Sequence, residues 1–180
     1  MKRAVVFMAN GTEEVEAITP IDYLRRAGVE VDVAGIGERD LMGAHDIRLT
    51  ADLAADDLEG PFDLVVVPGG RGCEAIGKDE SARNLIVKHF REGRLTASIC
   101  AAPVWVLGKH CGILAGRRFT CYPGLEKDPY GGTFVAERVV EDGNLITSRA
   151  AGCAGDFSVA VIRALLGKAA AEELASKVLL

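Results

Sequence analysis

Apolar positions along the chain follow two patterns, which alternate from the N-terminus to the C-terminus. Short apolar runs, typical of strands buried on both faces, occupy residues 4–8, 30–36, 62–67 and 95–99. Apolar residues at helical spacing predict helices over residues 13–27, 81–91, 101–109, 156–166 and 169–178. Gly28 and Gly93 follow two of these helices, in the position where a glycine commonly ends a helix.

Three further stretches have weaker patterns. Residues 45–53 are an ambiguous extended segment that fits a strand pair with the loop before it, and residues 118–121 predict a short strand. The pair Asp142-Gly143, between the runs at 134–141 and 144–147, predicts an antiparallel hairpin. Because strands and helices alternate, we predict an α/β fold. It is a three-layer sandwich with a mostly parallel sheet, formed by residues 1–180 as a single domain.

Composition and charge exclude several classes of protein. The 180 residues are 49% hydrophobic and 26% charged, which suits a globular chain and not a disordered one. The formal net charge of −5 gives no reason to expect specific binding to nucleic acid or to an anionic membrane. No apolar run approaches the roughly 20 residues that cross a bilayer. The run after Lys2-Arg3 also ends too early for a signal peptide, so we expect a cytoplasmic protein.

The five cysteines are irregularly spaced and odd in number: Cys73, Cys100, Cys111, Cys121 and Cys153. Without a signal peptide, this pattern argues against a disulfide framework. The three histidines are scattered and no C-x-x-C pair exists, so we expect no metal site. Free cysteines are commonly buried, and the question is whether one of the five thiols differs from the others.

Cys100 directly follows the predicted strand at 95–99 and precedes a predicted helix. This arrangement resembles a nucleophile elbow without its usual glycines. Ligands of open α/β sheets bind beyond the carboxyl ends of the strands, where Cys100 would lie. The N–H groups and dipole of the following helix would favour the thiolate. A buried structural cysteine is the alternative, and it fits the position equally well.

The neighbouring strand ends at Pro68-Gly69-Gly70. Glycines let backbone amides approach a ligand, and the N–H groups of Gly70 and Ala101 could together bind an oxyanion. The loose dinucleotide pattern G-x-G-x-x-A also begins at residue 70. However, the next strand ends in Cys100, where a ribose-binding acid would be needed, so we expect no cofactor. A plain tight turn is the third interpretation.

Glu13, Glu14 and Glu16 occupy the first turn of the first predicted helix. Acidic residues there usually complement the helix dipole at the surface, which is the expected role of Glu13 and Glu14. Glu16 differs because Pro20 cannot donate a hydrogen bond to its carbonyl group, so the helix could bend toward the crevice of Cys100. A carboxyl group that shares a proton with a thiolate has a raised pKa, which makes Glu16 a candidate acid/base.

Five motifs occur in order along the chain: GTEEVE at 11–16, RRAG at 25–28, DLVVVPGG at 63–70, SICAAP at 98–103 and LITSR at 145–149. Together they resemble the ThiJ/PfpI superfamily, in particular its DJ-1 branch, over essentially the whole chain. The resemblance implies a flavodoxin-like domain, similar to that of class I glutamine amidotransferases, which usually forms a homodimer. It also implies that Cys100 is the reactive cysteine, Glu16 its partner, and Gly70 and Ala101 the amides beside it.

The sequence departs from the family pattern at three places near the expected pocket. Ala101 stands where the protease branch has a histidine, which disfavours a Cys-His protease. Tyr122 stands where some relatives have a histidine, which argues against a histidine-assisted step. Residues 150–153 replace a Gly-Pro-Gly turn with Ala-Ala-Gly-Cys. The candidate pocket residues are Asn10, Gly69, Tyr122, Arg149 and Cys153.

The resemblance implies two functions that share one site. The first is cofactor-independent detoxification of reactive dicarbonyls, like that of glyoxalases and deglycases. Cys100 would attack methylglyoxal or an early adduct, Gly70 and Ala101 would hold the oxyanion, and Glu16 would move the proton. The second is a redox-sensing stress-response protein or chaperone, in which Cys100 is oxidised to a sulfinate. The oxyanion donors and the acid/base pair have no obvious use in sensing, so we favour the enzyme.

Overall fold

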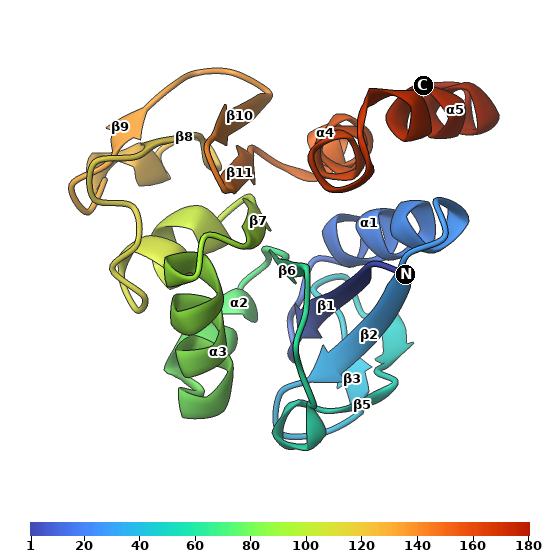
Figure 1. The fold of residues 1–180 in the computed structure, drawn as a ribbon. Coiled ribbons are helices and arrows are strands. Elements are labelled where there is room, and N and C mark those ends of the chain that lie inside the picture. Colours follow the sequence, from blue (N-terminus) through green and yellow to red (C-terminus); the bar gives the residue numbers. More distant parts are fainter.

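A seven-stranded sheet forms the middle layer of the structure, a computed structural model that describes all residues from 1 to 180 (Figure 1). Its strands lie in the order β10 (Val139–Asp142), β11 (Leu145–Ser148), β7 (Leu95–Ile99), β6 (Leu64–Val67), β1 (Arg3–Met8), β2 (Glu30–Gly35) and β5 (Leu53–Ala54). Neighbouring strands are parallel except for the antiparallel pair β10–β11. The predicted fold class, with its mostly parallel sheet and small hairpin, is therefore confirmed.

Helices cover both faces of the sheet (Figure 1). One face carries α1 (Glu14–Arg26), α4 (Ala154–Leu166) and α5 (Lys168–Val178). The other carries α2 (Cys73–Lys78), α3 (Glu80–Arg91) and the π-helix η2 (Pro103–Gly108). Along the strands, Val6 and Val66 pack against the first layer, and Val5 and Val65 against the second. All four are fully buried, which explains why these strands are continuous apolar runs in the sequence.

Shorter elements connect the layers. The ambiguous segment at 45–53 contains β4 (Arg48–Thr50), which pairs with β3 (Asp40–Met42) from the loop before it, and the start of β5. A second small sheet joins β8 (Arg118–Phe119) and β9 (Thr133–Phe134). The remaining short helices are η1 (Ala55–Asp57), η3 (Leu125–Lys127) and η4 (Ala151–Cys153).

Three details differ from the sequence-based prediction. Helix α2 was not predicted, because six residues are too few to show a helical period. The helix predicted over 101–109 is a π-helix, in which the amides of Lys109 and Cys111 bond to carbonyls five residues earlier. The strand predicted over 134–141 is divided, because β9 pairs with β8 while β10 joins the main sheet.

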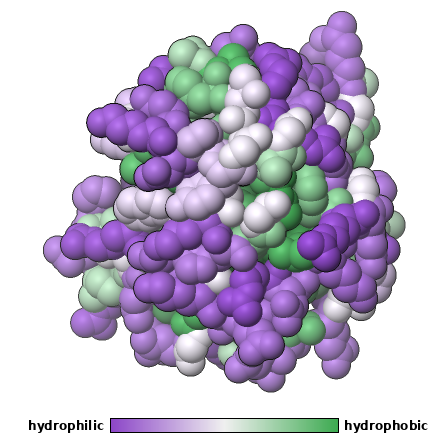
Figure 2. Space-filling model, turned by 90° about the vertical axis from the view of Figure 1, so that its left-hand side faces the viewer, coloured by the Kyte–Doolittle hydropathy of each residue, from purple (hydrophilic) through white to green (hydrophobic).

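Polar and apolar side chains are unevenly distributed over the surface. Figure 2 shows the face on which α3 and β9 lie, which is mainly hydrophilic with smaller hydrophobic areas. Exposed apolar side chains also occur on α1 (Val15 and Ile18) and on the β3–β4 hairpin (Met42 and Ile47). None of the helices has both the length and the apolar character needed to cross a membrane.

Candidate active site

Cys100 directly follows β7, and its backbone is left-handed with a φ of 66°. That conformation costs a residue with a side chain on the order of 1–3 kcal/mol, so neighbouring groups must hold it. The Cys100 N–H donates to the carbonyl of Ser148 at 3.0 Å, and its carbonyl accepts from the Tyr122 N–H at 2.8 Å. The other four cysteines are buried, whereas Cys100 is partly exposed. This is the geometry of the predicted nucleophile elbow.

Glu16 lies in the first turn of α1 and is only 1% exposed. Its Oε2 accepts a hydrogen bond from the N–H of Gly69 at 3.1 Å. The Cys100 thiol and the backbone of Ala151 also face this carboxyl group. Pro20 lies inside the helix and cannot bond to the Glu16 carbonyl. The structure therefore brings Glu16 and Cys100 together, as the sequence predicted.

Close packing at the end of β6 requires glycine at positions 69 and 70. A Cβ on Gly69 would lie 2.5 Å from both Cys100 Cβ and Glu16 Oε2. Gly70 has a φ of 82°, and a Cβ there would collide with the backbone nitrogen of Glu13. The Glu13 N–H in turn donates to the Gly69 carbonyl at 3.1 Å, which joins this loop to the start of α1.

The electrostatics of the pair depend mainly on burial. Burial raises the pKa of Glu16 to about 7, and the nearby Glu13 carboxylate adds to the increase. Burial also raises the pKa of the Cys100 thiol to about 12, together with the charge of Glu16. The backbone amides of Gly70 and Ala101 face the sulfur and act in the opposite direction.

Burial and the adjacent Glu16 carboxylate therefore oppose the thiolate that the backbone amides and the following helix favour. The helix that follows begins only at Pro103, and the amides near the sulfur do not outweigh burial and an adjacent carboxylate. The Glu16 carboxyl group, whose pKa is raised to about 7, lies where it can exchange a proton with the Cys100 sulfur. The arrangement suits a thiol that loses its proton to Glu16 as it attacks.

The remaining candidate pocket residues have different surroundings. The Gly69 N–H donates to the Glu16 carboxyl group, and the Tyr122 N–H donates to the Cys100 carbonyl. The Tyr122 residue is 49% exposed. Asn10 bonds to Glu38 and to the backbone N–H of Met42, so it ties the end of β1 to β3 and to the loop before it. Arg149 and Cys153 lie on the segment after β11, partly buried and buried respectively.

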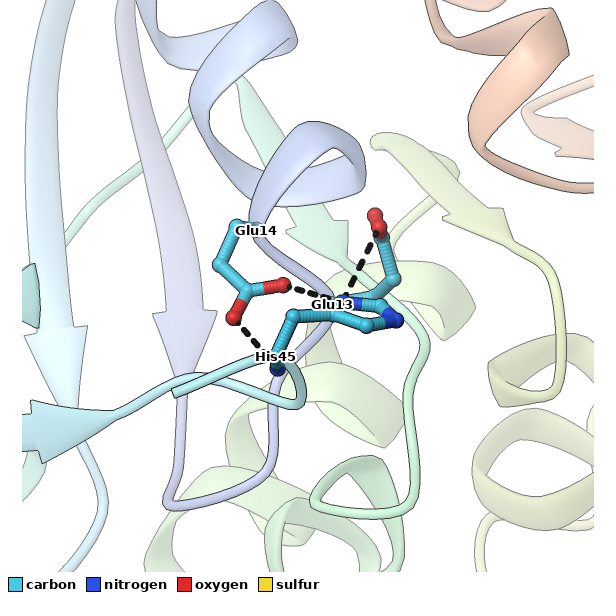
Figure 3. Close-up of side chains that lie close together, drawn as sticks. All are labelled: Glu13, Glu14 and His45. Carbon is cyan, nitrogen blue, oxygen red and sulfur yellow. Dashed lines mark hydrogen bonds and ion pairs between the residues drawn. The ribbon is translucent and has the colours of Figure 1, made fainter. Parts of the chain in front are cut away.

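A second cluster lies beside the first turn of α1 and joins Glu13, Glu14 and His45 (Figure 3). One ligand atom from each lies within 4.8 Å of the others, so these residues could hold a metal ion. His45 Nδ1 lies 2.8 Å from Glu14 Oε2, and the His45 N–H donates to Glu14 Oε1 at 2.7 Å. These contacts make an ion pair that ties the loop between β3 and β4 to α1.

The ion pair shifts the pKa of both partners. The hydrogen bond to Glu14 raises the pKa of His45. Burial acts to raise the pKa of Glu14, but the hydrogen bonds from His45 outweigh it and lower that pKa. Sequence reasoning missed this cluster, because His45 is 31 residues from Glu14 in the chain. The glycine at position 43 fits this contact, because a Cβ there would collide with the Glu14 carboxylate.

The chain is similar in sequence to known proteins named DJ-1 homologs and deglycases. Protein dj-1beta of Drosophila melanogaster is 39% identical over 183 residues, which cover 99% of this chain and 97% of that protein. A deglycase of Pyrococcus abyssi is 37% identical over 153 residues, 83% of this chain and 91% of that protein. Two DJ-1 homologs of Arabidopsis thaliana are longer, and the match covers only 40% and 47% of their length.

Solved structures and family models lead to the same group of proteins. The crystal structure of a mutant DJ-1 superfamily protein from Salmonella typhimurium has a TM-score of 0.94 at 36% identity, covering 99% of this chain and 98% of that chain. The DJ-1/PfpI family model matches residues 2–164. Since that match spans most of the chain and the relatives cover nearly all of it, this protein belongs to the DJ-1/PfpI family.

Proposed function

We propose that the protein is a cysteine-dependent enzyme that detoxifies reactive dicarbonyls, such as methylglyoxal or its early adducts, without a cofactor. The observation that carries the proposal is the contact between Cys100, the one partly exposed thiol, and the buried carboxyl group of Glu16. A carboxyl group with a pKa of about 7 is suited to general acid/base catalysis near neutral pH. Two similar proteins, from Pyrococcus abyssi and Pyrococcus horikoshii, are named deglycases, which supports the same chemistry.

The first step joins the thiol to the substrate. The Cys100 sulfur attacks the aldehyde carbon and forms a C–S bond, while the thiol proton passes to the Glu16 carboxylate. The electron pair of the C=O bond moves to oxygen, where the amides of Gly70 and Ala101 stabilise the negative charge. Glu16 then returns the proton to that oxygen, and a hemithioacetal results.

The second stage moves hydrogen within the substrate. Glu16 removes the proton from the carbon bound to sulfur, which gives an enediolate, and delivers it to the neighbouring carbon, while the hydroxyl proton of the hemithioacetal passes to the former ketone oxygen. The aldehyde carbon is thereby oxidised and the ketone carbon reduced, leaving a lactoyl thioester on Cys100. Water hydrolyses the thioester to lactate and the free thiol. Because oxidation and reduction occur in one molecule, the reaction needs no electron acceptor.

Deglycation would begin from an adduct already formed on an amine or a thiol. Free dicarbonyls are in equilibrium with such adducts. Removal of the free dicarbonyl therefore also lowers the concentration of the adducts. Lactate formation from free methylglyoxal therefore measures the chemistry that both activities share.

Redox sensing is the second candidate function, and the exposure of Cys100 alone among the cysteines favours it. A peroxide would oxidise the thiol to a sulfenic acid and then to a sulfinic acid, with loss of water or an alcohol at each step. Protonated Glu16 would donate a hydrogen bond to the sulfinate. Oxidation at this site would also remove the nucleophile that the enzyme needs.

We also propose that the protein forms a homodimer through α1 and the β3–β4 hairpin. Val15, Ile18, Met42 and Ile47 are between 39% and 54% exposed on these elements. The hairpin is held beside the segment before α1, where the Gly11 N–H donates to the Met42 carbonyl at 2.7 Å. Exposed apolar side chains on adjacent elements are typical of a protein interface.

Replacement of either reacting group should greatly slow lactate formation from methylglyoxal. We expect kcat/KM to fall by about 100-fold or more in Glu16→Gln, the range lost with a general base, and further in Cys100→Ser, which lacks the nucleophile. The measurement is the rate of lactate production by the wild type and both variants, with folding checked by circular dichroism. Equal rates in all three proteins would refute the proposed enzyme.

The rate should depend on pH through Glu16. Its carboxylate must accept the thiol proton, so kcat/KM should rise with pH, with a midpoint near the pKa of about 7, and level off above it. One pH unit below the midpoint the rate should be about tenfold lower than the plateau. In Glu16→Gln this inflection should be absent, and its persistence there would assign the titration to another group.

Mild peroxide should oxidise Cys100 before the other thiols, because Cys73, Cys111, Cys121 and Cys153 are buried. Mass spectrometry of peptides after brief exposure to hydrogen peroxide measures this selectivity. Comparable oxidation of all five cysteines would remove the basis for a sensor.

The proposed dimer should dissociate when a charge is placed on the exposed face of α1. We expect Ile18→Glu to be a monomer in analytical ultracentrifugation, because a carboxylate is costly to bury in an apolar interface. Leu179→Glu, at an exposed apolar residue near the C-terminus, is the control and should remain a dimer. A monomeric wild type, or a dimeric Ile18→Glu, would contradict the proposal.

A further inference from the structure

Cys73 begins α2, directly after the glycine loop that borders Cys100. Its N–H donates to the Gly70 carbonyl at 3.2 Å, and the N–H of Gly70 faces the Cys100 sulfur. A Cβ on Gly69 would lie 2.5 Å from Cys100 Cβ, so the start of this loop is packed directly against the reactive residue. The loop therefore contacts Cys100 at one end and carries a second thiol at the other.

The Cys73 side chain is buried in the part of the core against which Cys100 packs. Cys73 is 0% exposed and belongs to the apolar core between the sheet and the layer of α2, α3 and η2. The Cys100 side chain packs against the same core. Burial raises the pKa of Cys73, and the charge of an ionised Cys100 adds to the increase. Because the effect of a charge weakens with distance, this influence agrees with two neighbouring thiols.

We propose that Cys73 is the resolving thiol for Cys100: once a peroxide has oxidised Cys100 to a sulfenic acid, Cys73 converts it to a reversible disulfide. This inference rests on the redox reactivity of Cys100 proposed above, and it names the product. The main product of mild oxidation would then be a disulfide and not a sulfinic acid. The modification site consists of one partly exposed thiol and one buried thiol.

The reaction has two balanced steps. In the first, the Cys100 sulfur forms a bond to one oxygen of the peroxide and the O–O bond breaks. The thiol proton leaves with the second oxygen, as water or an alcohol. In the second step, the Cys73 sulfur attacks the Cys100 sulfur, an S–S bond forms, and the S–O bond breaks. The departing hydroxide takes the Cys73 proton and leaves as water, so two thiols are oxidised and one peroxide is reduced.

Competition between Cys73 and a second peroxide molecule decides the product. Burial keeps the proton on Cys73, which makes it a weak nucleophile and slows its attack. However, hydrogen bonds hold the start of α2 in place, since the Gly72 N–H donates to the Gly11 carbonyl at 2.9 Å. A reactant held within the same molecule has an effective concentration far above that of a dilute external one. We therefore expect the disulfide to form before the sulfinic acid.

Burial also makes the disulfide reversible by one route. Cys73 cannot meet a peroxide or a reductant directly, because none of its surface is exposed. Cys100 is partly exposed, so a dithiol from solution can attack its sulfur and release Cys73 as a thiol. The second thiol of the reductant then displaces Cys100 and closes a disulfide in the reductant. The proposed enzyme would thus recover its nucleophile after oxidation.

Cys121 provides a matched control. It is a fully buried thiol, and the next residue along the chain donates its N–H to the Cys100 carbonyl. Burial raises the pKa of Cys121, and the charged groups that act on it in addition are Glu126 and Arg149. Its thiol therefore has different neighbours from Cys73, although its backbone passes close to the site. Replacing Cys121 should leave the oxidation of Cys100 unchanged.

The test is a map of the disulfides that form when the reduced protein meets a small excess of hydrogen peroxide. Free thiols are alkylated under denaturing conditions, and the peptides are identified by mass spectrometry. In the wild type we expect a peptide pair joined through Cys73 and Cys100, with the protein mass lowered by about 2 Da through loss of two hydrogen atoms. Dithiothreitol should restore both thiols. This measurement requires no variant.

Two variants then separate the resolving thiol from the control. Cys73→Ala removes the thiol and keeps a small apolar side chain in the core. Its Cys100 should proceed to the sulfinic acid, and the fraction of Cys100 that dithiothreitol restores should fall by about tenfold or more. Cys121→Ala should behave like the wild type. Circular dichroism checks that both variants are folded.

Different failures have different meanings. Sulfinic acid at Cys100 of the wild type, with no disulfide, would overturn the inference and leave redox sensing in place. A disulfide between Cys100 and Cys121, or full recovery of Cys100 in Cys73→Ala, would overturn it as well. If peroxide leaves Cys100 unchanged, the sensor and the inference fail together, while lactate formation still tests the proposed enzyme separately.

Discussion

The left-handed backbone at Cys100 is the constraint on which the site depends. Ile99 is in register with Ser148 in the parallel pair of β7 and β11, and the Cys100 N–H adds a bond to the Ser148 carbonyl. The chain then turns sharply, and the Tyr122 N–H holds the Cys100 carbonyl. These two bonds keep a strained residue at the edge of a rigid sheet. The sulfur consequently stays beside the Glu16 carboxyl group and the Gly70 amide.

Topology gathers the other parts of the site at the same edge. Strands β1, β6 and β7 are neighbours and run parallel, so the segments after them meet. Those segments carry Glu16, Gly69-Gly70 and Cys100. Close contact between them leaves no room for a Cβ at Gly69, and it removes water from Glu16. The same packing thus positions the carboxyl group and raises its pKa.

Sequence patterns predicted the features that are set by residues close together in the chain. Val5, Val6, Val65 and Val66 lie in apolar runs and in fully buried strands. The six-residue helix α2 could not be predicted because it is too short to show a period. A helix was predicted where η2 lies, but apolar spacing does not distinguish its five-residue hydrogen bonds from those of an α-helix. The bonds of Asn10 to Glu38 and Met42 were not predicted either, because these partners lie about 30 residues away in the chain.

By itself, the sequence determined the fold class, the strand ends where chemistry gathers, and the pairing of Cys100 with Glu16. Each of these follows from local periodicity, from turn residues such as Gly69 and Gly70, or from motifs that resemble a family. Only the tertiary structure decided the direction in which the pKa of Cys100 shifts and the pairing of Glu14 with His45. Burial and charge act through space, so groups far apart in the chain set these properties and no local pattern carries them.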